Sequence, residues 1–140
     1  MAQFSRSAPT TVLIVEHEGI VRRELGDQLT DLGFTVLVAG NADEGIALLE
    51  THPEIELLLT DIKMPGSMDG IRLAHHVRDR WPPVKIIVVS GMIETQLADL
   101  PHGSAFLPKP YDPCGLAEVI GHLTDRKRPP LASARSGSQA

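Results

Sequence analysis

Five short apolar runs, with helical patterns between them, constrain the fold more than any other feature of this sequence. The runs cover residues 11–15, 35–38, 55–60, 85–90 and 104–107. Most of them are rich in β-branched residues and apolar at consecutive positions, which is typical of strands buried on both faces of a parallel sheet. Strands that alternate with helices through right-handed crossovers give an α/β fold. The pattern therefore predicts a doubly wound five-stranded parallel sheet with helices on both faces.

The helices are predicted from apolar residues at helical spacing and from capping residues before them. Asn41 with Glu44 three positions later resembles a capping box, and Asp112 followed by Pro113 is typical of the start of a last helix. The segment 93–100, bounded by proline and glycine, predicts a short fourth helix at most. The positions expected to face the core are Val21, Leu25, Leu29 and Leu32 in the first helix, Ile46, Leu48 and Leu49 in the second, Ile71, Ala74 and Val77 in the third, and Leu116, Val119, Ile120 and Leu123 in the last.

Length, charge and cysteine content narrow the classes of function. A chain of 140 residues suits one compact domain, and we expect it to fold over 10–125, with a flexible N-terminus at 1–9 and a disordered tail at 126–140. The net charge of -5 argues against nucleic acid as the main partner. No apolar run approaches the roughly 20 residues of a membrane helix. A polar start without an apolar signal segment, and a single cysteine, favour a cytoplasmic location.

Polar side chains follow four of the five predicted strands. Glu16 and His17 follow the first strand, Asp61 the third, Ser90 the fourth and Lys109 the fifth. Carboxyl ends of parallel strands meet at one edge of the sheet, where functional groups gather. An aspartate after a strand more often only shapes a turn. Acids, a hydroxyl and an amine at one edge, however, could bind a divalent metal and a phosphoryl group.

Four segments at these strand ends resemble the motifs of response-regulator receiver domains, the CheY-like domains of two-component signalling. They occur in the family's order and at nearly its spacing, and the resemblance covers roughly residues 11–123. One such segment would be weak evidence, whereas four in register are specific. The segments are Val15-Glu16-His17-Glu18, Leu58-Leu59-Thr60-Asp61-Ile62-Lys63-Met64-Pro65-Gly66, Val88-Val89-Ser90-Gly91 and Leu107-Pro108-Lys109-Pro110-Tyr111.

The resemblance implies that Asp61 accepts a phosphoryl group. The donor would be a phosphohistidine on a sensor histidine kinase or on a histidine phosphotransfer protein. The Ser90 hydroxyl would hydrogen-bond the phosphoryl group, and Lys109 would neutralise another of its oxygens. The Lys109–Pro110 peptide bond would be cis, as in the family.

The resemblance also implies a site for Mg²⁺ made by Glu16, His17, Asp61 and the backbone carbonyl of Lys63. His17 stands where the family has a second acid, which is usually a direct ligand. Mg²⁺ prefers oxygen ligands, and imidazole suits transition metals better, so we expect weakened Mg²⁺ binding. Glu18 compensating for the lost acid, a preference for Mn²⁺, and His17 as a neutral space-filler remain as alternatives.

Other positions are expected to tune the switch or to contact partners. By the same resemblance, Phe106 would hold the family's aromatic switch position. Phe106 and Tyr111 would belong to the surface that docks a downstream protein target or a second copy in a homodimer. The resemblance also implies that Lys63 and Met92 would flank the path of the water that removes the phosphoryl group. Neither accepts a proton readily, so slow self-dephosphorylation is expected.

The leading hypothesis is a single-domain response regulator in a phosphorelay that signals by protein contact and is not an enzyme beyond its own phosphorylation. The alternative is a degenerate receiver that takes no phosphate and serves as an interaction or dimerisation module, which His17 favours. A phosphatase using an aspartyl phosphate would resemble Asp-x-Asp, but position 63 is lysine. A nucleotide-binding fold would need a glycine-rich loop after the first strand, and none is present.

Overall fold

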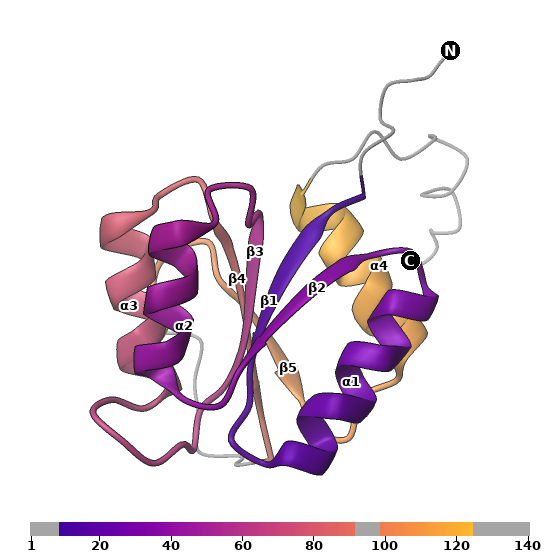
Figure 1. Cartoon of the computed structure of the whole chain (residues 1–140), viewed down its shortest axis with the longest axis horizontal. Coiled ribbons are helices and arrows are strands. Elements are labelled where there is room, and N and C mark those ends of the chain that lie inside the picture. The colour runs from indigo at the N-terminus through magenta and orange to yellow at the C-terminus, as the bar shows by residue number, and fades with distance from the viewer. Residues whose placement is uncertain (1–8, 92–98, 125–140) are drawn as a thin grey trace.

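A computed structural model describes residues 9–91 and 99–124 as a five-stranded parallel sheet between two layers of helices (Figure 1). The strand order is β2-β1-β3-β4-β5. Helices α2 and α3 cover one face of the sheet, and α1 and α4 cover the other (Figure 1). The predicted doubly wound α/β fold is therefore confirmed. In chain order the elements are β1 (Thr11–Val15), α1 (Gly19–Asp31), β2 (Thr35–Ala39), α2 (Ala42–Thr51), β3 (Leu57–Asp61), α3 (Gly70–Arg80), β4 (Lys85–Ser90), β5 (Ala105–Pro108) and α4 (Pro113–Thr124).

The three inner strands form the centre of two apolar cores. Every residue of β1 and β3 is buried. Because side chains alternate across a sheet, Leu13 and Val15 pack beneath α2 and α3, whereas Val12 and Ile14 pack beneath α1 and α4. The strands are apolar at consecutive positions because both faces are covered by helices, as the sequence predicted.

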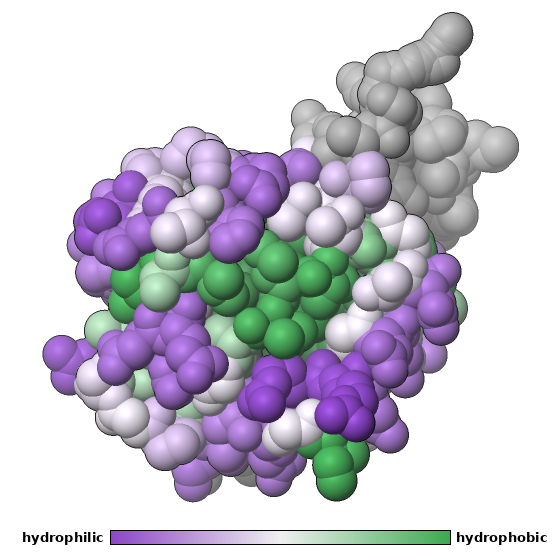
Figure 2. Space-filling model, in the orientation of Figure 1, coloured by the Kyte–Doolittle hydropathy of each residue, from purple (hydrophilic) through white to green (hydrophobic). Residues whose placement is uncertain are grey.

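The prediction that the strands are buried on both faces is wrong for the two edge strands, β2 and β5. In β2 only Ala39 is buried, and Val38 is 45% exposed. Strand β5 has no buried residue. Figure 2 shows apolar side chains gathered across the middle of the face that β2 forms, between the more polar surfaces of the flanking helices. Edge position, which depends on the order of strands in space, explains why the β-branched composition alone did not separate these two strands from the inner ones.

The helix boundaries follow from capping residues. Asn41 caps α2 by accepting a hydrogen bond from the Glu44 N–H at 2.9 Å, and Glu44 reaches back to the N–H of Gly40 at 2.7 Å. This is the predicted capping box with its second bond moved one residue earlier. Asp112 caps α4 through the Gly115 N–H at 3.1 Å, as predicted.

The first helix differs from the prediction at its end. Leu25 and Leu29 are buried as expected, but Leu32 is 44% exposed. Helix α1 ends at Asp31, and Leu32 is its C-cap residue, so the helical spacing no longer directs this side chain to the core. Gly33 follows with a φ of 100°, a conformation that suits glycine after a helix end.

Some of the predicted segments lie outside the residues that the structure describes. The expected fourth helix at 93–100 lies, apart from its last two residues, outside the described residues, so the label α4 belongs to the last helix. The predicted flexible N-terminus and disordered tail lie outside them too, apart from Pro9. Among the helices that are described, none is long and apolar enough to cross a membrane.

Candidate functional site

The predicted polar residues do meet at the carboxyl edge of the sheet. Glu16 directly follows β1, Asp61 is the last residue of β3 and Ser90 is the last residue of β4. The β5 register pairs Ser90 with Pro108, which places Lys109 next to the other three strand ends. The exposed fractions of Glu16, Asp61 and Ser90 are only 4%, 7% and 2%. Three polar groups are thus held at the rim of an apolar sheet.

Asp61 is fixed by contacts to both of its carboxylate oxygens. Its Oδ2 lies 3.2 Å from the Nζ atom of Lys109, which donates a hydrogen bond to it. Its Oδ1 accepts a hydrogen bond from the N–H of Ile62 at 2.8 Å. The ammonium of Lys109 also lies 3.9 Å from Oε1 of Glu16. One cation therefore stands between two buried carboxylates.

Lys109 is aimed by the backbone at the end of β5. Its N–H donates to the carbonyl of Ser90 at 2.9 Å, which continues the ladder past the last strand residue. The peptide bond Lys109–Pro110 is cis, as predicted.

Glu16 carries a perturbed carboxyl group. Burial is the main cause that raises its pKa, and the negative charge of Asp61 raises it further. A hydrogen bond from the Glu18 N–H to Oε2, at 3.0 Å, and the nearby Lys109 and His17 act in the opposite direction but do not cancel the effect. A cation bound beside Glu16 would therefore stabilise its charged carboxylate.

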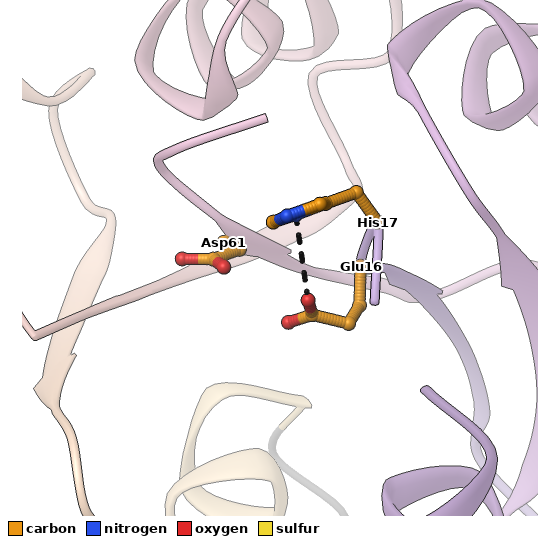
Figure 3. Close-up of side chains that lie close together, drawn as sticks. All are labelled: Glu16, His17 and Asp61. Atoms are coloured by element: carbon orange, nitrogen blue, oxygen red, sulfur yellow. Dashed lines mark ion pairs between the residues drawn. The ribbon is translucent and has the colours of Figure 1, made fainter. Parts of the chain in front are cut away.

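Glu16, His17 and Asp61 lie together at the ends of β1 and β3 (Figure 3). Each offers one ligand atom, and these atoms all lie within 4.8 Å of one another. The Nδ1 atom of His17 is 3.6 Å from Oε2 of Glu16, and its side chain is 37% exposed. Glu18 is exposed at the start of α1 and does not belong to this group. The two carboxylates fit a Mg²⁺ ion, but the imidazole does not match the oxygen ligands that this ion prefers.

The other residues predicted from the sequence lie around the site, and their roles stay predictions. Phe106 is partly buried against the core beneath α2 and α3, and Tyr111 against the core beneath α1 and α4. The pKa of Tyr111 is raised, first by burial and then by the charges of Glu16 and Asp61, which favours the neutral hydroxyl. Lys63 is exposed two residues beyond Asp61, and Met92 lies outside the described residues.

Two supporting residues were not predicted from the sequence. The guanidinium of Arg22, on α1, donates to the backbone carbonyl of Glu16 at 2.8 Å and so holds the segment after β1. Gly70 begins α3, and a Cβ added there would overlap the carbonyl oxygen of Asp61. The pair Asp69-Gly70 was a usable signal, since aspartate is a common N-cap residue, and Asp69 does cap α3 by accepting from the Arg72 N–H at 2.9 Å.

A doubly wound parallel sheet with buried acids and a lysine at its carboxyl edge defines a class of α/β protein, and comparison with known proteins specifies the family. The model of the response regulator receiver domain matches residues 12–120. This chain therefore belongs to the response regulator receiver domain family. Members of this family are the receiver domains of two-component systems, which generally bind Mg²⁺ at an acidic pocket and interact with histidine kinases and downstream effectors.

Similar proteins include parts of much longer chains. The chain is 34% identical over 125 residues to the sensor kinase CckA of Brucella abortus, an alignment of 86% of this chain and 13% of that protein. It is 33% identical over 136 residues to the transcriptional regulatory protein AruR of Pseudomonas aeruginosa, covering 92% of this chain and 55% of that protein. The chain thus spans between about an eighth and about half of the length of these relatives.

Solved structures share the whole domain. A CheY-like response regulator receiver domain protein from Methanospirillum hungatei JF-1 has a TM-score of 0.75 and 30% identity, covering 84% of this chain and 94% of that one. The receiver domain of the hybrid histidine kinase CckA has a TM-score of 0.69 and 32% identity, covering 81% of this chain and 98% of that one.

Proposed function

We propose that this chain takes a phosphoryl group from a phosphohistidine onto Asp61 and passes the signal on by contact with another protein. The donor is a sensor histidine kinase or a histidine phosphotransfer protein. The observation that carries the proposal is the position of Lys109, whose Nζ atom is 3.2 Å from Oδ2 of Asp61 and 3.9 Å from Oε1 of Glu16. A cation held there before the reaction needs no reorganisation to meet the charge of an incoming phosphoryl group.

The transfer itself requires little covalent chemistry from the protein. A carboxylate oxygen of Asp61 forms a bond to phosphorus while the bond between phosphorus and the donor's imidazole nitrogen breaks, and the leaving imidazole takes up a proton from solvent. Lys109 neutralises one phosphoryl oxygen, and the Ser90 hydroxyl at the end of β4 donates a hydrogen bond to another. A divalent ion held by Glu16 and Asp61 would supply further neutralisation of the phosphoryl oxygens.

Signalling then depends on surfaces around β5 and α4. Phe106 on β5 and Tyr111 before α4 lie partly buried on opposite faces of the sheet, and Tyr111 is electrostatically linked to Glu16 and Asp61. The contact with the downstream target, or with a second copy of the chain, would lie on the surface around β5 and α4. The protein would act in the cytoplasm and would not bind nucleic acid or membranes.

One observation favours a second candidate function. His17 replaces a carboxylate that the family uses at its metal site, and a receiver unable to bind metal would serve only as an interaction or dimerisation module. The retained group of Asp61, Ser90 and Lys109 favours phosphorylation over this alternative, and the two make opposite predictions for labelling.

The test is incubation with acetyl phosphate in the presence of Mg²⁺ or Mn²⁺, followed by intact-mass measurement. We expect wild-type protein to gain the mass of one phosphoryl group and Asp61→Asn to gain none. The matched control is Asp79→Asn, at an exposed aspartate on α3, which should label like the wild type. No labelling of the wild type by acetyl phosphate or by a phosphorylated histidine donor would overturn the proposal and favour the interaction module.

A further inference from the structure

We propose that the metal site of this receiver selects a first-row transition ion, such as Co²⁺ or Zn²⁺, over Mg²⁺, because His17 supplies a nitrogen ligand. The inference rests on the proposed function, since it concerns the ion that would assist phosphorylation of Asp61. It differs from the general Mg²⁺ binding of the family in the identity of the ion and in the ligand that selects it.

The spacing of the three ligand atoms suits a small divalent ion. Two ligands about 2.1 Å from one ion lie about 3 Å apart when adjacent and about 4.2 Å apart when opposite. The His17 Nδ1 and Glu16 Oε2 atoms are 3.6 Å apart, and all three ligand atoms of Glu16, His17 and Asp61 lie within 4.8 Å of one another. Shifts of a fraction of an ångström therefore bring them around one ion, and Figure 3 shows the side chains side by side at the strand ends.

The charge of the site works against Mg²⁺. Of the two carboxylates, Asp61 already has Lys109 at 3.2 Å, and Lys109 also lies 3.9 Å from Glu16. Two acids and one ammonium leave a formal charge of about minus one, because a neutral imidazole adds none. Mg²⁺ gives up its waters reluctantly and depends on anionic oxygen ligands, so a site with one acid fewer binds it less well.

The same substitution favours ions that bond to nitrogen. Imidazole is a common ligand of Zn²⁺, Co²⁺ and Ni²⁺, and affinity for a mixed nitrogen and oxygen site rises from Mn²⁺ toward Cu²⁺. The Nδ1 atom of His17 lies 3.6 Å from a carboxylate oxygen of Glu16, and the side chain is 37% exposed. An ion arriving from solvent can therefore reach the ring. The replacement of an acid by His17 thus changes the selectivity of the site as well as its affinity.

The test compares Co²⁺ and Mg²⁺ affinities by isothermal titration calorimetry in wild type, His17→Asn and His17→Asp. Asparagine is neutral like imidazole but can offer an oxygen ligand, so His17→Asn isolates the ligand type, whereas His17→Asp adds the charge. Transition ions bind most sites more tightly than Mg²⁺, so the informative quantity is the change in the ratio. We expect the ratio of Co²⁺ to Mg²⁺ affinity to fall by about tenfold or more in both variants. The control His122→Asn, at an exposed histidine on α4, should keep the wild-type ratio.

Pulsed electron paramagnetic resonance of bound Mn²⁺ gives a direct signature. Coupling to a ¹⁴N nucleus should appear in wild type and in His122→Asn and disappear in His17→Asn. An unchanged affinity ratio, or nitrogen coupling that persists in His17→Asn, would overturn the inference. Should His17→Asn fail to fold, ¹H–¹⁵N spectra of the wild-type imidazoles with Zn²⁺ decide instead, since coordination must shift one ring nitrogen of His17, and an unshifted ring overturns the inference.

These results separate the metal site from the phosphorylation. A ratio that falls in His17→Asn while Asp61 takes no phosphate from acetyl phosphate or from a histidine donor supports the metal inference and overturns the proposed function. Labelling of Asp61 with an unchanged ratio does the reverse.

Discussion

Gly70 lies directly behind the proposed phosphoacceptor, and Gly70→Ala tests how tightly helix α3 is packed there. Gly70 is the first residue of α3, and its N–H donates to the carbonyl of Ile62 at 2.8 Å. An added Cβ would overlap the carbonyl oxygen of Asp61 and lie 2.8 Å from both the Asp61 carbonyl carbon and the Ile62 Cα. All three atoms are backbone, so no side chain can turn away to make room.

Gly70→Ala should destabilise the domain, although alanine has the higher helix propensity. In a helix free of tertiary contacts, alanine in place of glycine stabilises by about 1 kcal/mol. Overpacking against a rigid neighbour typically costs about 1–3 kcal/mol, and backbone neighbours place this change at the upper end. A loss of about 3 kcal/mol corresponds to a melting temperature lower by about 10 °C for a domain of this size. Labelling of Asp61 should slow too, because the strand end that carries it must move.

The assay is thermal unfolding followed by circular dichroism, together with the rate of acetyl phosphate labelling. Gly115→Ala is the matched control, since a Cβ there meets only Asp112 atoms at 3.9 and 4.0 Å, an ordinary contact, and it should melt at or slightly above the wild-type temperature. If Gly70→Ala melted as Gly115→Ala does and labelled at the wild-type rate, the close approach of α3 to β3 would be refuted.

Three further predictions follow from individual side chains. In metal-free protein, Glu16→Gln should be more stable than wild type at neutral pH. This advantage should shrink as the pH falls through the raised Glu16 pKa, because only the wild type gains stability by taking up a proton there. Urea midpoints measured across pH test this, and an advantage that grew on acidification would contradict it. Asp69→Ala should lower the unfolding free energy by about 1 kcal/mol through loss of an N-cap, with Asp79→Ala near neutral, as urea titrations would reveal. Combining Lys63→Asn with Met92→Glu should speed loss of phosphate from Asp61, measured by mass at saturating metal, because these side chains can orient a water; unchanged decay would remove both positions from that role.

The inner part of the fold was predictable because local pattern and tertiary position agree there. The runs predicted at 11–15 and 85–90 coincide with β1 and β4, since strands covered on both faces leave a continuous apolar signal. Asn41 and Asp112 marked helix starts correctly because capping is a local hydrogen bond. The exposure of β2 and the edge position of β5 could not be read in the same way, because strand order is set by the packing of helices far apart in the sequence.

The same distinction between local pattern and three-dimensional position applies to the functional site. Residues at strand ends were predictable because parallel strands bring their carboxyl ends to one edge whatever the details of the loops. The contact of Arg22 with the Glu16 carbonyl depends on where a long side chain on α1 can reach, and the need for glycine at position 70 depends on the distance between α3 and β3. Neither distance is encoded in a periodicity, so both became visible only in three dimensions.

The two halves of the site also differ in how far they depart from the family. On the side of the proposed phosphoacceptor, Asp61 is held by the Ile62 N–H and by Lys109, and neither contact involves His17. On the metal side, Glu16 is shared between the Glu18 N–H, His17 and Lys109, so a change at position 17 alters the charge that an ion meets. Lys109 contacts both acids, at 3.9 Å from Glu16 and 3.2 Å from Asp61, and so links the two halves. Histidine in place of an acid can therefore change which ion binds, and how strongly, while the proposed phosphoacceptor Asp61 keeps its contacts.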